Sequence, residues 1–154
     1  MSRIHYPMLI RFLIKGGCNP ALHWRIFVET FNIYTMTQIQ IENSIKDLNR
    51  LVIDGKVMEA FETYYHEEVA MQENELPATV SKEANRKREL EFLSNIAEFR
   101  KAEVKGIAVQ GNVSFVIWSY DYTHKSWGIR DYTQVSVQEW KDGQIIRERF
   151  IYLN

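Results

Sequence analysis

Apolar residues after position 37 recur at the spacing of two amphipathic helices. In the first, apolar positions lie four, three and four residues apart, and they are Ile41, Ile45, Leu48 and Val52. Thr37 and Gln40 have the spacing of a capping box at its start, and Asp54-Gly55 ends it. A second, shorter helix is predicted from Val57, Ala60, Phe61 and Tyr64.

The next segment predicts a short strand, a loop and a third helix. We expect the strand over residues 69–72 and the loop over residues 73–80. Ser81 is placed to cap the third helix, because its side-chain oxygen can accept from a free backbone N–H. The charged segment 85–91 is predicted to form the solvated start of this helix. Its apolar face is expected to carry Phe92, Ile96 and Phe99.

From Lys101 onward the pattern changes to the alternation of β-strands. The phase slips at Gly106, which predicts a β-bulge and a bend. Gly111-Asn112 and Asp142-Gly143 are two-residue turn signals. Long strands are therefore predicted over residues 113–122, 129–140 and 144–152. Helices followed by an antiparallel meander predict an α+β domain with the helices on one face of a curved sheet.

Composition agrees with one globular domain and excludes several partners. The chain has 154 residues, of which 45% are hydrophobic, enough for a sizeable core. The net charge of −1 lacks the basic field of a nucleic-acid-binding protein. The single cysteine, Cys18, excludes an intrachain disulfide framework and most cysteine-based metal sites. We therefore expect a protein of the reducing cytoplasm that does not bind nucleic acid.

The first 35 residues differ from the rest in charge. Only Glu29 opposes their basic side chains, which are Arg3, Arg11, Lys15 and Arg25. The apolar run of residues 8–14 is interrupted and too short for a membrane span, and it lacks the features of a signal peptide. We expect residues 1–36 to be an extension outside the domain, with Met36 as an alternative start, and residues 37–154 to be the domain. The alternative is a helical arm around residues 21–34 that packs on the domain or on a partner.

Two segments carry a resemblance to a known family. One reads Tyr64-Tyr65-His66-Glu67-Glu68-Val69-Ala70-Met71-Gln72, and the other reads Trp140-Lys141-Asp142-Gly143-Gln144-Ile145. With the order of the predicted elements, they resemble the nuclear transport factor 2-like superfamily, in its SnoaL-like branch, over residues 37–154. The resemblance implies a cystatin-like cone, in which a curved antiparallel sheet of about four to five strands packs against three helices.

This superfamily implies a fold more than a function. Its members include ketosteroid isomerases, polyketide cyclases, epoxide hydrolases, dehydratases and non-catalytic modules. No complete catalytic set of a characterised member matches this chain. The cone itself encloses a pocket, where a polar side chain is costly unless it is hydrogen-bonded or functional.

Strand alternation limits which acids can face such a pocket. Asp121 lies opposite in phase to the aromatic residues Tyr120 and Tyr122. It could be a general base with a raised pKa, or a solvated carboxylate paired with Arg130 or Lys125.

Glu148 is the second acidic candidate. It shares a face with Ile146, Phe150 and Tyr152, opposite Ile145 and Arg147. An acid on an apolar face is a pocket candidate, and a cross-strand ion pair is the alternative interpretation.

Five further residues are candidates for ligand binding. Tyr65 and Gln134 could orient a ligand oxygen. Trp118 could line the pocket, or it could belong to the core or to a dimer interface. Glu73 and Asn74 could reach the pocket mouth, or simply form a turn.

Neither a metal nor a cofactor is expected. His66 is predicted at a helix end and His124 in an exposed loop, so three convergent zinc ligands are lacking. The chain therefore predicts a domain that binds a small hydrophobic ligand, with no nucleic-acid or membrane partner, and that dimerises through its sheet.

Two functions remain open. The first is a cofactor-independent isomerase, cyclase or lyase, in which Asp121 or Glu148 moves a proton and Tyr65 or Gln134 stabilises an oxyanion. The second is a non-catalytic ligand-binding or dimerisation module.

Overall fold

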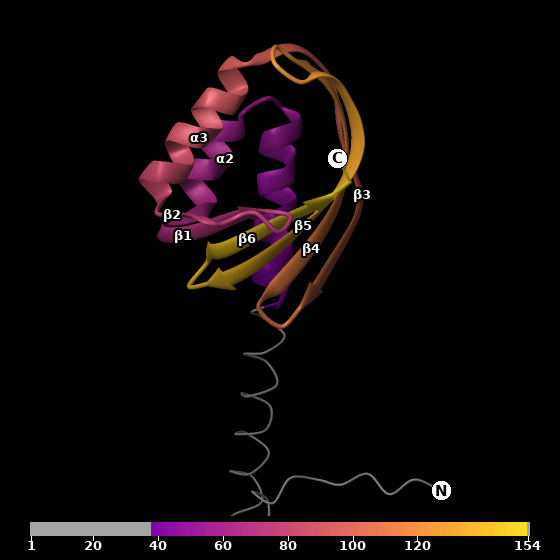
Figure 1. Cartoon of the computed structure of the whole chain (residues 1–154). Helices are drawn as coiled ribbons and strands as arrows, with labels where there is room; N and C mark the ends of the chain where they lie inside the picture. The colour runs from indigo at the N-terminus through magenta and orange to yellow at the C-terminus, as the bar shows by residue number, and fades with distance from the viewer. Residues whose placement is uncertain (1–37, 154) are drawn as a thin grey trace, which may run out of the picture. The chain divides into compact units, whose positions relative to one another are not determined.

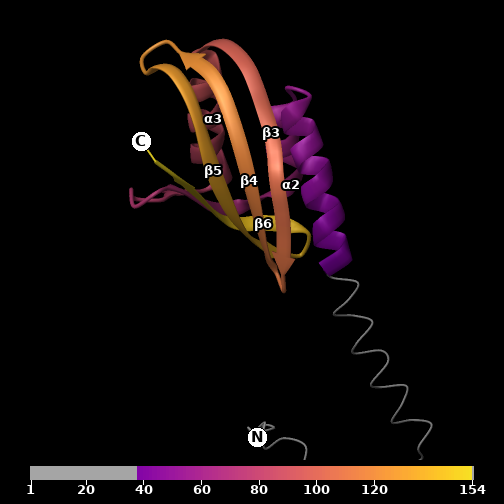
Figure 2. The ribbon, with the colours of Figure 1, turned by 90° about the vertical axis from the view of Figure 1, so that its right-hand side faces the viewer.

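Three helices of the described chain pack against one face of a six-stranded sheet (Figures 1 and 2). The structure is a computed structural model that describes residues 38–153. The α+β class, with three helices on a curved sheet, is confirmed, although the sheet has six strands rather than four to five. The predicted Thr37 cap, the extension 1–36 and the helical arm 21–34 lie outside the described residues.

The helices cover residues 38–53, Val57–Tyr64 (α2) and Lys82–Ser94 (α3). The strands are β1 (Tyr65–Glu73), β2 (Thr79–Val80), β3 (Ile96–Gln110), β4 (Val113–His124), β5 (Gly128–Lys141) and β6 (Gln144–Tyr152), in the sheet order β2-β1-β6-β5-β4-β3. The strands from β3 to β6 form the predicted antiparallel meander.

One strand pair departs from the expected antiparallel sheet. β1 pairs with β6 in parallel, so the sheet is mixed. This pair joins segments that are far apart in the sequence, and the alternation within each strand carries no information about its partner. The turn signals, in contrast, are local, and Asp142 (φ 50°) and Gly143 (φ 83°) form the predicted hairpin in the left-handed region.

The ends of two helices differ from their predictions. α2 passes directly into β1, because Tyr65 already has extended backbone angles, so His66 lies in a strand rather than at a helix end. α3 ends at Ser94, and both Ile96 and Phe99 belong to β3 rather than to the helix. The start of α3 is confirmed, since Ser81 Oγ accepts from the Ala84 N–H at 3.2 Å.

The strand pairs contain several register shifts, and two of them bear on the predicted directions of side chains. The predicted irregularity at Gly106 is present as a register shift between Val104 and Gly106. A second shift lies in the β5–β6 pair, where Trp140 pairs with Ile145 and Glu139 with Arg147. The predicted alternation in β6 is therefore wrong at its start, because Ile145 and Glu148 are both buried.

The apolar core lies between the first two helices, β1 and the end of the sheet that carries the β3–β4 and β5–β6 hairpins. The predicted stripe of the first helix is confirmed by the burial of Ile41, Ile45 and Leu48. These side chains pack with a larger cluster that includes Leu51, Phe61, Val69, Met71, Val116, Trp118, Trp140 and Ile145. The opposite half of the same concave surface is not filled, and there the molecule has a cavity.

Candidate functional site

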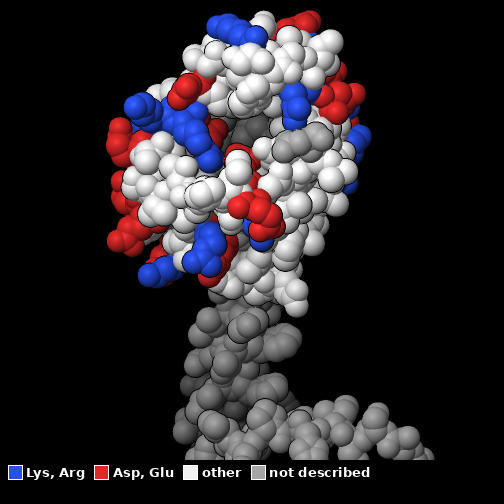
Figure 3. Space-filling view, in the orientation of Figure 1, with Lys and Arg blue, Asp and Glu red and all other residues white. Residues whose placement is uncertain are grey.

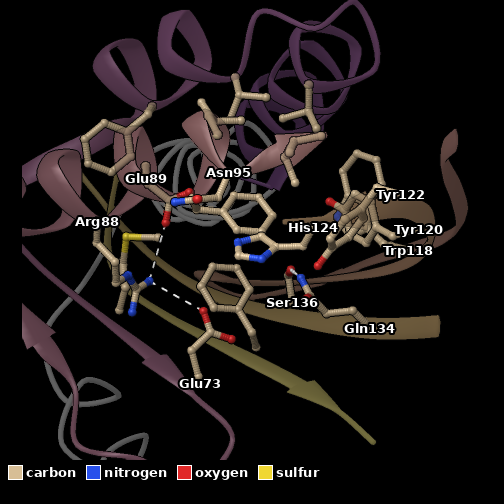
Figure 4. Close-up of a pocket in the computed structure, with 18 of the residues that line it drawn as sticks. Glu73, Arg88, Glu89, Asn95, Trp118, Tyr120, Tyr122, His124, Gln134 and Ser136 are labelled. Atoms are coloured by element: carbon tan, nitrogen blue, oxygen red, sulfur yellow. Dashed lines mark hydrogen bonds and ion pairs between the residues drawn. The ribbon is translucent and has the colours of Figure 1, made fainter. Parts of the chain in front are cut away.

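A cavity of about 1070 Å³ lies between the helices and the inner face of the sheet. Figure 3 shows the molecule hollowed on this side, and Figure 4 shows the side chains around the hollow. Its wall is formed by the first two helices, α3 and the strands β1, β3, β4, β5 and β6. The volume is close to the upper end of the range of about 300–1,000 Å³ for pockets that bind small organic molecules.

Alternate residues of β4 and β5 form the sheet side of the cavity. β4 contributes Trp118 and Tyr120, whose rings stack at 5.3 Å, and Tyr122. β5 contributes a polar row that consists of Gln134, Ser136 and Gln138. Both Trp118 and Gln134 were ligand-binding candidates, and both line the cavity.

Glu148 is a buried carboxyl in the cavity wall, with only 2% of its surface exposed. The hydroxyl of Tyr65 donates to Glu148 Oε2 at 2.5 Å, and Gln138 Nε2 donates to Oε1 at 2.8 Å. Burial raises the pKa of Glu148 to about 7, although both hydrogen bonds act to lower it. The structure thus brings the candidates Tyr65 and Glu148 into direct contact.

A directional chain of hydrogen bonds supports this carboxyl. The indole N–H of Trp140 donates to Ser114 Oγ at 2.8 Å, and Ser114 donates to Gln138 Oε1 at 2.8 Å. An indole nitrogen can only donate, so the Ser114 hydroxyl must accept from Trp140 and donate its own hydrogen to Gln138 Oε1. This orients the Gln138 amide with its NH₂ group toward Glu148. The carboxylate therefore receives a donor on each oxygen.

A second charged group lines the cavity on α3 and β1. Arg88 lies 3.5 Å from Glu89 and 3.6 Å from Glu73, as the dashed lines in Figure 4 show. Burial raises the pKa of both carboxyls, and the charge of Arg88 opposes this change. Glu73 is thus a candidate that does reach the cavity.

Two candidates lie away from the cavity lining. Asn74 connects the end of β1 to β6, since its Oδ1 accepts from the Tyr152 backbone N–H at 3.0 Å. Asp121 is on the outer face of β4, where it pairs with Arg100 at 2.6 Å rather than with Arg130 or Lys125. The hydrogen bond from Arg100 lowers the pKa of Asp121. Among the two candidate acids, the cavity contains only Glu148.

Sequence reasoning missed Glu89, because segment 85–91 is highly charged and was assigned to solvent. A signal was available, since Asn85, Glu89 and Phe92 are four and three residues apart and therefore share one helix face. Asn85 is fully buried, and Glu89 and Phe92 line the cavity.

His124 was also misplaced by the sequence. It lies in β4 with 4% of its surface exposed, and its ring stacks on Trp127 at 3.7 Å. The prediction of an exposed loop was wrong because β4 continues two residues beyond its expected end.

Residues 38–153 contain neither a metal-binding cluster nor a membrane-spanning helix. No group of three or more His, Cys, Asp or Glu side chains in this range is arranged to hold a metal ion. No helix in the same range is both long and apolar enough to cross a membrane.

Comparisons with known proteins agree with this fold. Residues 36–152 match the model of the SnoaL-like domain family, and the chain belongs to that family. A proposed SnoaL-like polyketide cyclase from Mesorhizobium loti has 28% sequence identity and a TM-score of 0.66, over 73% of this chain and 98% of that one. The sequence search against curated proteins gives no match.

More distant structures share the fold. A proposed SnoaL-like polyketide cyclase from Jannaschia sp. has 14% identity and a TM-score of 0.63, over 75% of this chain and 86% of that one. TerC, co-crystallised with polyporic acid, has 14% identity and a TM-score of 0.61, over 74% of this chain and 91% of that one. The same fold occurs in a nuclear transport factor 2-like protein from Burkholderia xenovorans, with 16% identity and a TM-score of 0.64 over 77% of this chain and 87% of that one.

Proposed function

We propose that this protein binds a small organic molecule in the cavity and that Glu148 exchanges a proton with it. The reaction class is a cofactor-independent isomerisation, cyclisation or lyase reaction. One observation carries the proposal: a carboxyl that is 98% buried lines the cavity and has a pKa of about 7. At neutral pH such a group exists in both protonation states, so it can accept a proton and return it.

The proton transfer needs a group that stabilises the charge left behind. When a C–H bond of the ligand breaks, its proton moves to Glu148, and the electron pair remains on the ligand as an enolate. Gln134 and Tyr120 line the same cavity, and an N–H or O–H donated by either would stabilise the enolate oxygen. Tyr65 serves instead to hold Glu148, because its hydroxyl donates to that carboxyl.

Exchange of carbon-bound hydrogen tests this proposal without knowledge of the natural substrate. 2-Tetralone, a ketone with acidic α-hydrogens, is incubated with the protein in D₂O, and loss of the α-hydrogen signal is followed by NMR. We expect exchange above the buffer rate, reduced by about 10²-fold or more in Glu148→Gln. Asp121→Asn is the control and should exchange at the wild-type rate. Equal exchange rates in wild type and Glu148→Gln would remove Glu148 as the proton acceptor.

The alternative is a non-catalytic ligand-binding or dimerisation module. The outer face of the sheet favours a dimer contact, because Ile117, Val135 and Ile151 are paired across three neighbouring strands. Ile117 is 41% exposed and Ile151 is 45% exposed. We propose that a second copy of the chain covers this apolar row. We also propose that the domain starts near residue 37 and that the protein works in the cytoplasm. Binding of 2-tetralone without exchange would favour the non-catalytic module.

A further inference from the structure

We propose that the cavity selects an organic cation, namely a protonated amine on an aromatic or other hydrocarbon body. This inference rests on the proposed function, because it names the ligand class of the same cavity. It is carried by the charges of the cavity lining, by the aromatic side chains among them and by the apolar surface that continues from them.

The cavity lining is rich in carboxylates and poor in cations. Within the described range, Arg88 is the only Lys or Arg among the lining residues. The acidic lining residues are Glu73, Glu89, Glu91, Glu98 and Glu148. Arg88 already contacts two of these carboxylates, and Arg100, which is outside the lining, pairs with Glu98. A bound carboxylate or phosphate would therefore add negative charge to a site that already has an excess of it.

Two of the acidic lining residues act on an aromatic residue of the cavity wall. Burial raises the pKa of the Tyr120 hydroxyl, and the charges of Glu148 on β6 and Glu89 on α3 raise it further. Trp118 stacks on Tyr120 at 5.3 Å, and Tyr132 lies 5.9 Å from it. Aromatic faces attract cations, and the attraction is stronger where water is excluded. A positive group beside Tyr120 would thus contact both kinds of partner.

Gln134 adds an acceptor that is independent of the acids. Its side chain lines the cavity and is only 7% exposed. Its Nε2 donates to Ser136 Oγ at 3.2 Å, and its Oε1 is an amide oxygen that can accept a hydrogen bond. A ligand N–H group could donate to this oxygen, and a ligand carboxylate could not.

The hydrocarbon body of the ligand has its own place in the cavity. Apolar lining side chains continue from the aromatic wall toward the first two helices, and they include Leu48, Val52, Phe61 and Met71. A bare metal cation or a small ammonium ion would leave this surface in contact with water. The lining therefore fits a molecule with a charged end and an apolar end.

Three probes of nearly equal size separate charge from shape. They are 2-phenylethylamine, which is cationic, 2-phenylethanol, which is neutral, and 3-phenylpropionate, which is anionic. Binding is measured by the change in tryptophan fluorescence, because Trp118 and Trp127 line the cavity. At pH 8 we expect the amine to bind about tenfold more tightly than the alcohol, and the anion to bind more weakly than both.

Charge-removing variants test the origin of this preference. Glu89→Gln and Glu73→Gln should each weaken binding of the amine by about fivefold, while binding of 2-phenylethanol stays the same. The unchanged alcohol shows that the cavity is still folded. Glu83→Gln is the matched control, because Glu83 is on α3 but its side chain is 82% exposed and outside the lining. It should bind all three probes as the wild type does.

The possible results separate this inference from the proposed function. If the alcohol or the anion binds as tightly as the amine, the charge assignment is overturned, while a ligand-binding cavity remains. Equal affinity for the amine in wild type and Glu89→Gln overturns it as well. If no probe binds, the inference also fails, and the exchange of 2-tetralone hydrogens decides the proposed function by itself.

Discussion

Glu148 shows how a single residue acquires its chemistry from its surroundings. Its neighbours in the sequence are Arg147 and Arg149, which favour an exposed ion pair. In the structure those arginines point away, and Tyr65 and Gln138 are the partners of the carboxyl instead. A carboxyl surrounded by protein loses hydration, and this loss exceeds the stabilisation from its two donors. Its pKa therefore rises to about 7 from the ordinary 4.5.

The raised pKa predicts how stability depends on pH. Between about pH 4.5 and 7 the folded protein holds the proton of Glu148 more strongly than the unfolded chain does. Stability is therefore greater below this range and falls as the pH rises through it, by on the order of 3 kcal/mol in total. Melting temperatures measured from pH 4.5 to 8 should show this decline, and Glu148→Gln should flatten it. A wild-type profile that rises through this range would contradict the assignment.

At the scale of elements, local patterns predicted which segments form helices and strands, but not where each one ends. The stripe of Ile41, Ile45 and Leu48 and the hairpin at Asp142-Gly143 were read correctly, because each depends on neighbours within a few residues. The end of α3 was predicted wrongly, because Phe92, Ile96 and Phe99 also fit a helical spacing. Pairing of Ile96 with His124 in the sheet overrides that spacing.

The cap of α3 gives a test at this scale. Ser81 accepts from the Ala84 N–H, and its own φ of 87° is in the region that favours glycine. Ser81→Ala loses the cap and keeps the strain, so we expect a loss of about 1 kcal/mol in the free energy of unfolding. Ser81→Gly loses the cap but relieves the strain, so it should lose less. Urea unfolding at equilibrium measures both, and a greater loss for glycine would contradict the cap geometry.

For the whole molecule, the two faces of the sheet differ in what they contact. The inner face holds the core at one end and the cavity at the other, so both are made by the same strands. The outer face carries the apolar row of Ile117, Val135 and Ile151 between charged groups such as the pair of Arg100 and Asp121. An apolar centre with a polar rim is the usual anatomy of an interface between proteins.

The proposed dimer predicts a specific response to mutation. Ile117→Asp should convert a dimer to a monomer at micromolar concentration, because a charge would be buried at the centre of the contact. Ile53→Asp is the matched control, since Ile53 is 47% exposed but lies on the first helix. Light scattering coupled to size exclusion gives the mass of each. A monomeric wild type would exclude the dimer.

The sequence by itself determined the class of fold, the family and most of the elements, because these follow from spacing, turn residues and local motifs. Tyr65, Glu73, Trp118, Gln134 and Glu148 were singled out from the sequence, and the structure places them around one cavity. Only the tertiary structure decided that Asp121 faces outward and that Glu89 faces inward. The direction of a side chain depends on bulges, on the parallel pairing of β1 with β6 and on how α3 packs against the sheet. Each of these joins residues far apart in the chain.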